Sequence, residues 1–218
     1  MINIAIDGPA GAGKSSVAKA VAQKLGFIYV DTGALYRSIG VNALRSNIET
    51  DNAQAVTEML PSVNVELKYV DGAQRVILNG DDVSEAIRMP EASMAASNVS
   101  AIPAVREFLL DLQRNMAATN NVIMDGRDIG TVILPNAQFK FFLTASAEVR
   151  ADRRFKELTE KGLTVDYKAL LDEIIQRDYN DSHRATAPLK QADDAILIDS
   201  SNMTIDEVIT FITDRIKV

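Results

Sequence analysis

The chain has no cysteine and only one histidine among its 218 residues. Without cysteine, disulfides and thiolate metal sites are excluded, and the reducing cytoplasm is the expected compartment. No apolar stretch approaches the length of a membrane span, and Met1 leads into a short apolar run without a basic leader or a cleavage site. We therefore expect a protein that is neither exported nor membrane-bound.

Basic residues are also scarce relative to acidic ones. The chain carries 23 Lys and Arg against 30 Asp and Glu, which gives a net charge of -7. This balance disfavours a broad nucleic-acid surface but permits a local basic pocket for small phosphates. The length and the 47% hydrophobic content fit one principal globular domain. We expect a monomer with small-molecule partners, without nucleic-acid polymers or membranes.

A glycine-rich run is the most informative feature present. Residues 8–15 have the spacing G-x-x-x-x-G-K-S, after the apolar run Ile2 to Ile6 and before the helical pattern Val17 to Leu25. In such a loop the backbone N–H groups surround a phosphate, Lys14 adds a positive charge, and Ser15 offers its hydroxyl to Mg²⁺. A glycine-rich turn that ends by chance in Lys-Ser is the alternative, and the flanking pattern disfavours it. The loop predicts a nucleoside triphosphate site.

Four further short apolar runs resemble Ile2 to Ile6, and helical stripes separate them. Continuous apolar runs are typical of strands buried on both faces of a parallel sheet. We therefore predict an α/β fold with a doubly wound parallel sheet. The four runs are Phe27 to Val30, Val122 to Met124, Phe139 to Leu143 and Ile196 to Ile198, and the stripes start at Val17, Val105 and Tyr167.

One segment breaks this pattern. From Val63 to Val83 apolar and polar residues alternate around Asp71-Gly72, and Asn79-Gly80 follows. Alternation around such turns predicts a small antiparallel insertion. We expect one P-loop domain, with a core of residues 1–60 and 84–218, an inserted substrate-binding lobe at about 61–83 and a lid at about 150–165.

The run Asp31 to Arg37 follows the second predicted strand. Asp31 or Thr32 can cap the next helix, Gly33 permits a close approach to the backbone, and Arg37 can reach back toward a phosphate. Taken alone, the pattern is an ordinary helix start with a surface arginine. The P-loop upstream makes the phosphate-binding interpretation the stronger one.

The third predicted strand ends in Asp125, and a glycine-framed Arg127-Asp128 pair follows. Ligands of open α/β sheets bind at the carboxyl ends of strands, so these side chains are expected near the P-loop. Asp125 can help to hold Mg²⁺ through water. The alternative for Arg127 and Asp128 is a purely structural salt bridge.

A late helical stretch places Arg177, Asp181 and Arg184 on one face. Alternating Arg and Asp can bind the phosphate and the hydroxyls of a nucleotide, although a solvated ion-pair face has the same pattern. The single histidine, His183, is predicted to lie on the helix surface and not to act in catalysis, because phosphoryl transfer requires no imidazole base.

A basic segment follows the fourth strand, with Arg150, Arg153 and Arg154 ahead of a possible hinge at Gly162. Such a segment can close over ATP phosphates and exclude water. An ordinary charged helix is the alternative.

Together, these motifs resemble those of the bacterial cytidylate kinases over nearly the whole length, including the inserted lobe. The resemblance implies a nucleoside monophosphate kinase fold and transfer of the γ-phosphoryl group of ATP to CMP or dCMP, with Mg²⁺. It departs from the family at Ser16, where many relatives carry Thr, and at Thr32, where some carry Ser. Both residues keep a hydroxyl group.

The resemblance also implies the residues of the site. Asp128 is expected to accept a hydrogen bond from the cytosine amine and to repel the uracil carbonyl, which would give base selectivity. Catalytic roles fall to Lys14, Arg127, Arg177 and Arg184, and Mg²⁺ binding to Ser15 and Asp125. The ATP site comprises Gly8, Pro9, Ala10, Gly11, Ala12, Gly13, Lys14, Ser15, Ser16, Arg153 and Arg154. The CMP site comprises Thr32, Tyr36, Arg37, Ser97, Arg106, Arg127, Asp128, Arg177, Asp181 and Arg184.

Two other functions remain open at this point. A kinase for UMP or for a hydroxylated metabolite can use the same core. A guanine nucleotide switch can also use a P-loop, but the chain lacks the Asn-Lys-x-Asp motif that reads guanine.

Overall fold

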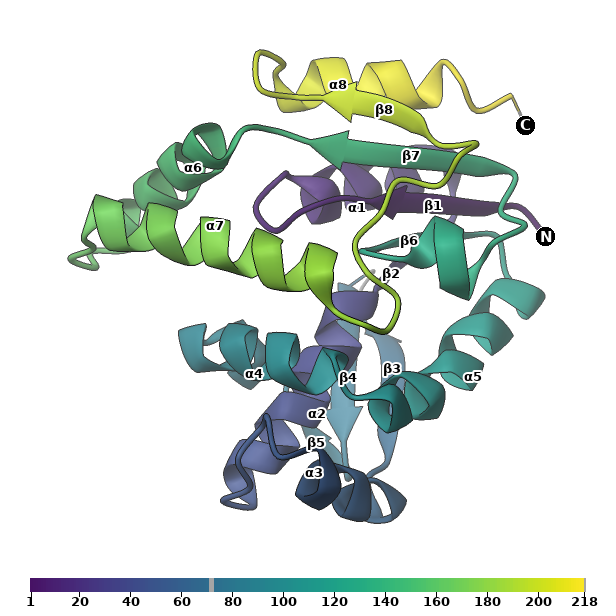
Figure 1. The fold of residues 1–218 in the computed structure, drawn as a ribbon. Helices are drawn as coiled ribbons and strands as arrows, with labels where there is room; N and C mark the ends of the chain where they lie inside the picture. The colour runs from purple at the N-terminus through teal and green to yellow at the C-terminus, as the bar shows by residue number, and fades with distance from the viewer. Residues whose placement is uncertain (71–72, 218) are drawn as a thin grey trace. The chain divides into compact units, whose positions relative to one another are not determined.

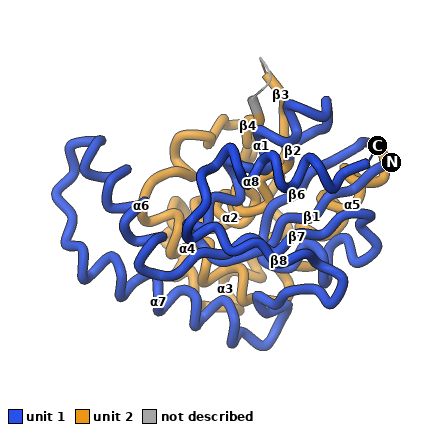
Figure 2. The backbone as a smooth tube through the Cα atoms, turned by 90° about the horizontal axis from the view of Figure 1, so that it is seen from above, with its two compact units in different colours: residues 1–29, 120–218 blue, residues 30–119 orange. Residues whose placement is uncertain are grey.

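A computed structural model describes residues 1–70 and 73–217, which form two compact units. Unit 1 comprises residues 1–29 and 120–218, and unit 2 comprises residues 30–119 (Figure 2). The chain therefore leaves unit 1 once, builds unit 2, and returns. Within the described residues, no helix is long and apolar enough to cross a membrane.

A five-stranded sheet has the order β2-β6-β1-β7-β8 (Figure 1). Strand β1 pairs in parallel with β6 and β7, and β7 pairs in parallel with β8. In β1, Ile4, Ala5 and Ile6 are fully buried, because the strand has a neighbour on each side. The predicted parallel sheet and its five strands are confirmed. Their bounds are β1 Asn3–Asp7, β2 Ile28–Asp31, β6 Val122–Gly126, β7 Phe139–Thr144 and β8 Ile196–Asp199.

Three helices of unit 1 begin at residues whose side chains cap them, whereas α1 begins after Gly13, which has no side chain. Ser146 accepts a hydrogen bond from the N–H of Val149 in α6, and Asp166 accepts one from Ala169 in α7. Thr204 and Glu207 form a reciprocal capping box at α8. These helices are α1 Lys14–Leu25, α6 Ala147–Glu160, α7 Tyr167–His183 and α8 Ile205–Thr213. Side chains from β1, β6, β7, α1 and α8 form the hydrophobic core of this unit.

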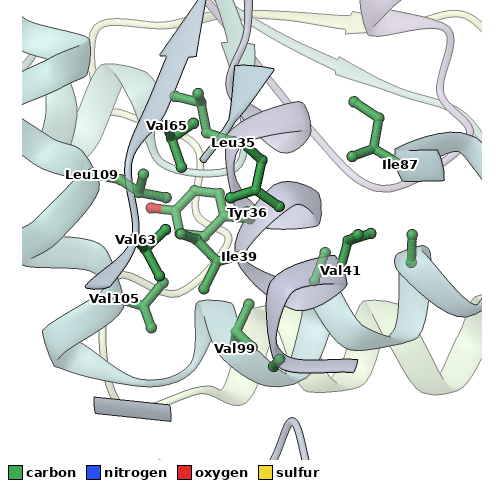
Figure 3. Packing of buried hydrophobic residues seen from close by; sticks show 14 of the residues in the cluster. Leu35, Tyr36, Ile39, Val41, Val63, Val65, Ile87, Val99, Val105 and Leu109 are labelled. Atoms are coloured by element: carbon green, nitrogen blue, oxygen red, sulfur yellow. The ribbon is translucent and has the colours of Figure 1, made fainter. Parts of the chain in front are cut away.

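Unit 2 has a core of its own, in which Leu35, Ile39 and Leu109 are fully buried (Figure 3). Its four helices are α2 Thr32–Arg45, α3 Ala53–Met59, α4 Pro90–Ser100 and α5 Pro103–Thr119. A three-stranded antiparallel sheet completes it, with β3 Val65–Val70, β4 Ala73–Leu78 and β5 Asp81–Asp82.

The antiparallel sheet agrees with the alternating pattern of the sequence. Val65 pairs with Leu78, and the register continues to Val70 and Ala73. Asn79 and Gly80, which join β4 to β5, both have positive φ, as a type I′ turn requires. The predicted turn at Asp71-Gly72 lies outside the described residues.

The unit boundaries differ from the predicted domain boundaries. The predicted lobe of residues 61–83 falls inside unit 2, which also includes α2, α4 and α5. The predicted lid of residues 150–165 falls inside unit 1. The division of residues 1–60 and 84–218 into a core around a lobe stays a prediction.

Candidate active site

The P-loop joins β1 to α1, as the sequence predicts. Gly8, Gly11 and Gly13 have positive φ, which other residues rarely adopt. A Cβ at Gly8 would lie 1.9 Å from the carbonyl oxygen of Leu143 in β7, so the loop is also packed tightly against the sheet. Lys14 is the first residue of α1, so the loop ends at the free N–H groups of the helix start.

Lys14 is almost fully buried, with 5% of its surface exposed. Its Nζ donates a hydrogen bond of 2.7 Å to the carbonyl oxygen of Pro9. Burial, followed by the positive charge of Arg127, lowers the pKa of Lys14 to about 7, although nearby carboxylates oppose the shift. An anion in this loop would favour the charged form of Lys14.

Asp125, near the end of β6, accepts hydrogen bonds from two hydroxyl groups. Ser15 Oγ donates to Asp125 Oδ2 at 2.8 Å, and Tyr29 Oη donates to Asp125 Oδ1 at 2.9 Å. The predicted pair Ser15 and Asp125 therefore lies together in unit 1. Tyr29 was not predicted, because an aromatic residue inside an apolar strand pattern carries no signal of a polar contact.

Four site residues form ion pairs within unit 1: Arg127 and Asp128 follow β6, Asp181 lies in α7, and Arg184 follows α7. Arg127 Nε donates to Asp181 Oδ2 at 2.8 Å, and Arg184 Nη2 lies 3.5 Å from Asp128 Oδ1. Asp128 and Asp181 are both nearly buried, so the solvated ion-pair face proposed as an alternative does not describe this cluster.

The charges of this cluster act on one another. Burial acts to raise the pKa of Asp181, but Arg127, through its charge and its hydrogen bond, holds that pKa below its ordinary value. The charges of Arg177 and Arg184 act in the same direction. The negative charge of Asp181 also acts to raise the pKa of Lys14, so these residues interact electrostatically with the P-loop. Unit 1 thus brings Lys14 together with an arginine cluster, which consists of Arg127, Arg177 and Arg184, among the carboxylates of Asp125, Asp128 and Asp181. Guanidinium and ammonium groups are side chains that can bind phosphate oxygens.

Helix α7 ends one residue before Arg184, so it contains only two of the three residues, Arg177, Asp181 and Arg184, that were predicted to share a helix face. It closes at His183, and Arg184 follows in extended conformation with its Nε donating to the carbonyl oxygen of Ala187 at 2.7 Å. His183 is exposed and stacks on Tyr179, with ring centroids 4.0 Å apart. Its place on the helix surface agrees with the sequence prediction.

The basic residues of α6 have different surroundings. Arg150 is nearly buried, donates to the carbonyl oxygen of Ala10 in the P-loop at 3.0 Å, and forms a two-bond ion pair with Asp178 of α7. Arg153 donates to the carbonyl oxygen of Ser200, and Arg154 donates to Glu157. The assignment of Arg153 and Arg154 to ATP stays a prediction.

Unit 2 holds the other residues expected at the CMP site. Asp31, not Thr32, caps α2: its Oδ1 accepts from the N–H of Ala34 at 2.9 Å. Arg37 reaches back along the helix, and its Nη2 donates to Asp31 Oδ2 at 2.8 Å. A Cβ at Gly33 would lie 3.0 Å from Arg37 Nη1, so glycine leaves room for this pair.

Tyr36 and Arg106 are brought together from α2 and α5. The Arg106 guanidinium lies 5.4 Å from the centre of the Tyr36 ring, within the range of a cation–π contact. Its Nη1 also donates to the carbonyl oxygen of Ser100 at 3.2 Å. Ser97 is half-buried on α4, and Thr32 is buried at the first turn of α2.

Asp7 is a buried acid that the sequence interpretation did not include. It ends β1, and its two carboxylate oxygens accept hydrogen bonds from the N–H groups of Ile129 and Gly130 at 2.8 and 2.7 Å. An acidic residue at the end of a buried strand, directly before a P-loop, was the available signal. Among residues 1–70 and 73–217, no cluster of three acidic or histidine side chains is arranged to hold a metal ion.

Comparison with known proteins assigns the chain to a family. The model of a family described as cytidylate kinase matches residues 4–218. A cytidylate kinase of Caldicellulosiruptor saccharolyticus is 57% identical over 95% of this chain and 92% of its own length. A cytidylate kinase of Clostridium botulinum is 49% identical over 99% of this chain and 98% of its own length. With the P-loop and the arginine cluster in one unit, these similarities show that the chain belongs to the cytidylate kinase family.

Proposed function

We propose that this chain transfers the γ-phosphoryl group of ATP to CMP or dCMP with the P-loop and the arginine cluster described above, giving ADP and CDP or dCDP. As a member of the cytidylate kinase family, the chain is an ATP-dependent nucleoside monophosphate kinase. The observation that supports the residue assignment is the ion pair between half-buried Arg127 and buried Asp181. This pair lies in the same unit as the P-loop, and both of its charges affect the pKa of Lys14.

On the donor side, the P-loop backbone and the start of α1 bind the ATP phosphates. Positive φ at three glycines turns successive N–H groups toward one point, and Lys14 adds a charge to them. We further assign Ser16 at the start of α1, and Arg153 and Arg154 of α6, to the ATP site.

On the acceptor side, Arg127, Arg177 and Arg184 bind the CMP phosphate and the transferred group. Arginine suits this task because its planar guanidinium donates several hydrogen bonds at once to phosphate oxygens. Asp181 fixes Arg127 through its ion pair and is itself assigned to the nucleotide hydroxyls. In unit 2 we assign Thr32, Tyr36, Arg37, Ser97 and Arg106 to CMP.

Base selectivity is assigned to Asp128. Its carboxylate accepts a hydrogen bond from the exocyclic amine of cytosine, whereas uracil presents a carbonyl oxygen that a carboxylate repels. Because Asp128 is buried, a base that presents an oxygen to its carboxylate would lose a hydrogen bond and meet a negative charge, although the Arg184 guanidinium stays nearby. Binding the wrong base is therefore costly.

The residues at Ser15 fit Mg²⁺, which prefers oxygen ligands and keeps several waters. Ser15 Oγ donates a hydrogen bond to Asp125, so the lone pairs of the hydroxyl oxygen remain for a cation, and the Asp125 carboxylate would hold a water of the cation. When bound, Mg²⁺ neutralises charge on the ATP phosphates. Tyr29 fixes Asp125 from the other side.

The proposed transfer is direct, without a covalent intermediate on the enzyme. Phosphoryl transfer depends chiefly on positioning and on stabilising charge, which Lys14 and the arginines provide. We propose the cytoplasm as its compartment, because the cytoplasmic nucleotide pools supply both substrates, and a monomer as the working form.

An acceptor panel tests this function. With ATP and Mg²⁺, ADP release is expected to be fast with CMP and dCMP, and kcat/KM for UMP is expected to be lower by about 100-fold or more. Equal rates with CMP and UMP would remove the role assigned to Asp128 and favour a kinase of broader acceptor range. Activity only with a hydroxylated metabolite would contradict the proposal.

A further inference from the structure

Asp7 makes an unusual pair of contacts for a residue that precedes a P-loop. Asp7 is 4% exposed, and both of its carboxylate oxygens accept hydrogen bonds from the backbone N–H groups of residues more than a hundred positions later in the chain. Burial raises the pKa of Asp7 to about 6, and the two backbone hydrogen bonds act against that shift. A buried carboxylate with two such bonds is fixed in position.

The two N–H groups belong to the start of a π-helical segment, Ile129–Ile133. The first N–H groups of a helix have no partner within the helix and require a cap. The residue at the capping position is Asp128, but its side chain makes no capping hydrogen bond. Asp7, from another strand, supplies the cap instead.

Because Asp7 caps this helix, the Asp128 carboxylate is not used as its cap. An aspartate at a helix start ordinarily bonds to the N–H groups of its own helix. Here the capping bonds go to Asp7, and the Asp128 carboxylate lies 3.5 Å from Arg184 Nη2. The carboxylate is therefore directed to a partner outside its own helix.

The packing around Gly130 leaves this arrangement little freedom. A Cβ at Gly130 would lie 3.3 Å from Asp7 Oδ2 and 3.1 Å from Cδ of Lys140. Lys140 is itself held by hydrogen bonds to Asp194 and to the carbonyl oxygen of Pro135. A side chain at position 130 would thus press the helix start away from Asp7.

We propose that Asp7 is a positioning residue for base recognition: by capping the helix that follows Asp128, it keeps the Asp128 carboxylate available for the cytosine amine. This inference rests on the proposed function, because it takes Asp128 as the residue that reads the base. Asp7 itself contacts neither substrate in this account.

The test compares kcat/KM for CMP and for UMP in Asp7→Asn, Gly130→Ala and Asp128→Asn. In Asp7→Asn the amide oxygen still accepts one N–H, but the amide NH₂ faces the other. We expect the ratio of CMP to UMP to fall by about tenfold or more, mainly through KM for CMP. Gly130→Ala, which disturbs the same contact from the other side, is expected to lower the ratio in the same direction.

A merely structural role for Asp7 would lower the melting temperature or kcat and leave the ratio unchanged. An unchanged ratio in Asp7→Asn, with a lowered ratio in Asp128→Asn, would overturn the inference while the proposed function stands. An unchanged ratio in Asp128→Asn would overturn both the base-reading assignment and the inference. If Asp7→Asn does not fold, the ratio in Gly130→Ala decides by the same criterion.

Discussion

At the scale of single residues, burial lowers the pKa of Lys14 and thereby makes its protonation sensitive to a bound anion. Its ammonium group lies in a nearly closed environment beside the like charge of Arg127, which makes the charged form costly. Phosphate oxygens would remove that cost. The free protein therefore holds Lys14 close to the point at which it loses its proton.

This arrangement predicts that ATP binding takes up protons. At pH 8 to 9, above the pKa of about 7 for Lys14, much of the free protein carries a neutral lysine, which bound phosphates recharge. We expect an uptake approaching about one proton per ATP, and little uptake by Lys14 at pH 6, where it is already charged. Calorimetric titration in buffers of different ionisation enthalpy measures it.

Lys14→Ala is the matched control. The variant is expected to lose the uptake and about 100-fold or more of the turnover, and to keep its circular dichroism spectrum. If Lys14→Ala takes up as many protons as the wild type, the assignment of this titration to Lys14 is wrong. Near wild-type turnover in the variant would contradict the role of the loop.

At the scale of elements, the loop between β1 and α1 depends on one glycine more than on the others. Gly8 has φ of 145°, and a Cβ there would overlap the carbonyl oxygen of Leu143 in the neighbouring strand. Gly26, which ends α1, has φ of 69°, and a Cβ there would have no atom of the described residues within 4 Å beyond its chain neighbours. Substitutions at Gly8 and Gly26 can therefore distinguish the cost of steric overlap from the cost of a left-handed backbone conformation.

Gly8→Ala is expected to lower the free energy of unfolding by more than ~3 kcal/mol, because the strand and the loop must move apart. Gly26→Ala is expected to cost only about 1 kcal/mol, since it adds left-handed strain without overlap. Urea denaturation without nucleotide measures both. Equal losses in the two variants would show that overlap with Leu143 does not govern this loop.

The sequence pattern predicted the strands better than it predicted the contacts between residues that are distant in the chain. The apolar runs predicted all five strands of the parallel sheet, and the alternation from Val63 predicted antiparallel strands. The π-helical segment Ile129–Ile133 was not predicted, because its capping group is Asp7 and that contact is invisible in local sequence. Similarly, nothing in the pattern of α7 indicated that it would end before Arg184.

At the scale of the whole molecule, the motifs predicted which residues form the site, but not the contacts that these residues make with one another. The P-loop spacing predicts a phosphate site from eight consecutive residues, because the chemistry of such a loop is local in sequence. The pairing of Arg127 with Asp181 joins residues 54 positions apart and depends on the fold. Likewise, nothing in the sequence indicated that Arg150, in the predicted lid, contacts Ala10 of the P-loop and Asp178 of α7.

The two compact units are bounded at other positions than the predicted lobe, which stays a prediction. Composition changes at the antiparallel strands, so sequence places a boundary there, whereas unit 2 also includes helices that look like the rest of the chain. Its core is built from α2, α4 and α5 together with the small sheet. The predicted lobe is thus one part of a larger packed unit.

The fate of the γ-phosphoryl group tests the central claim most directly. With ATP radiolabelled at that group, Mg²⁺ and CMP, we predict that the label appears in CDP and that its release from ATP depends on CMP. A hydrolytic switch would instead release labelled inorganic phosphate. Label found mainly in inorganic phosphate, at a rate independent of CMP, would contradict the account.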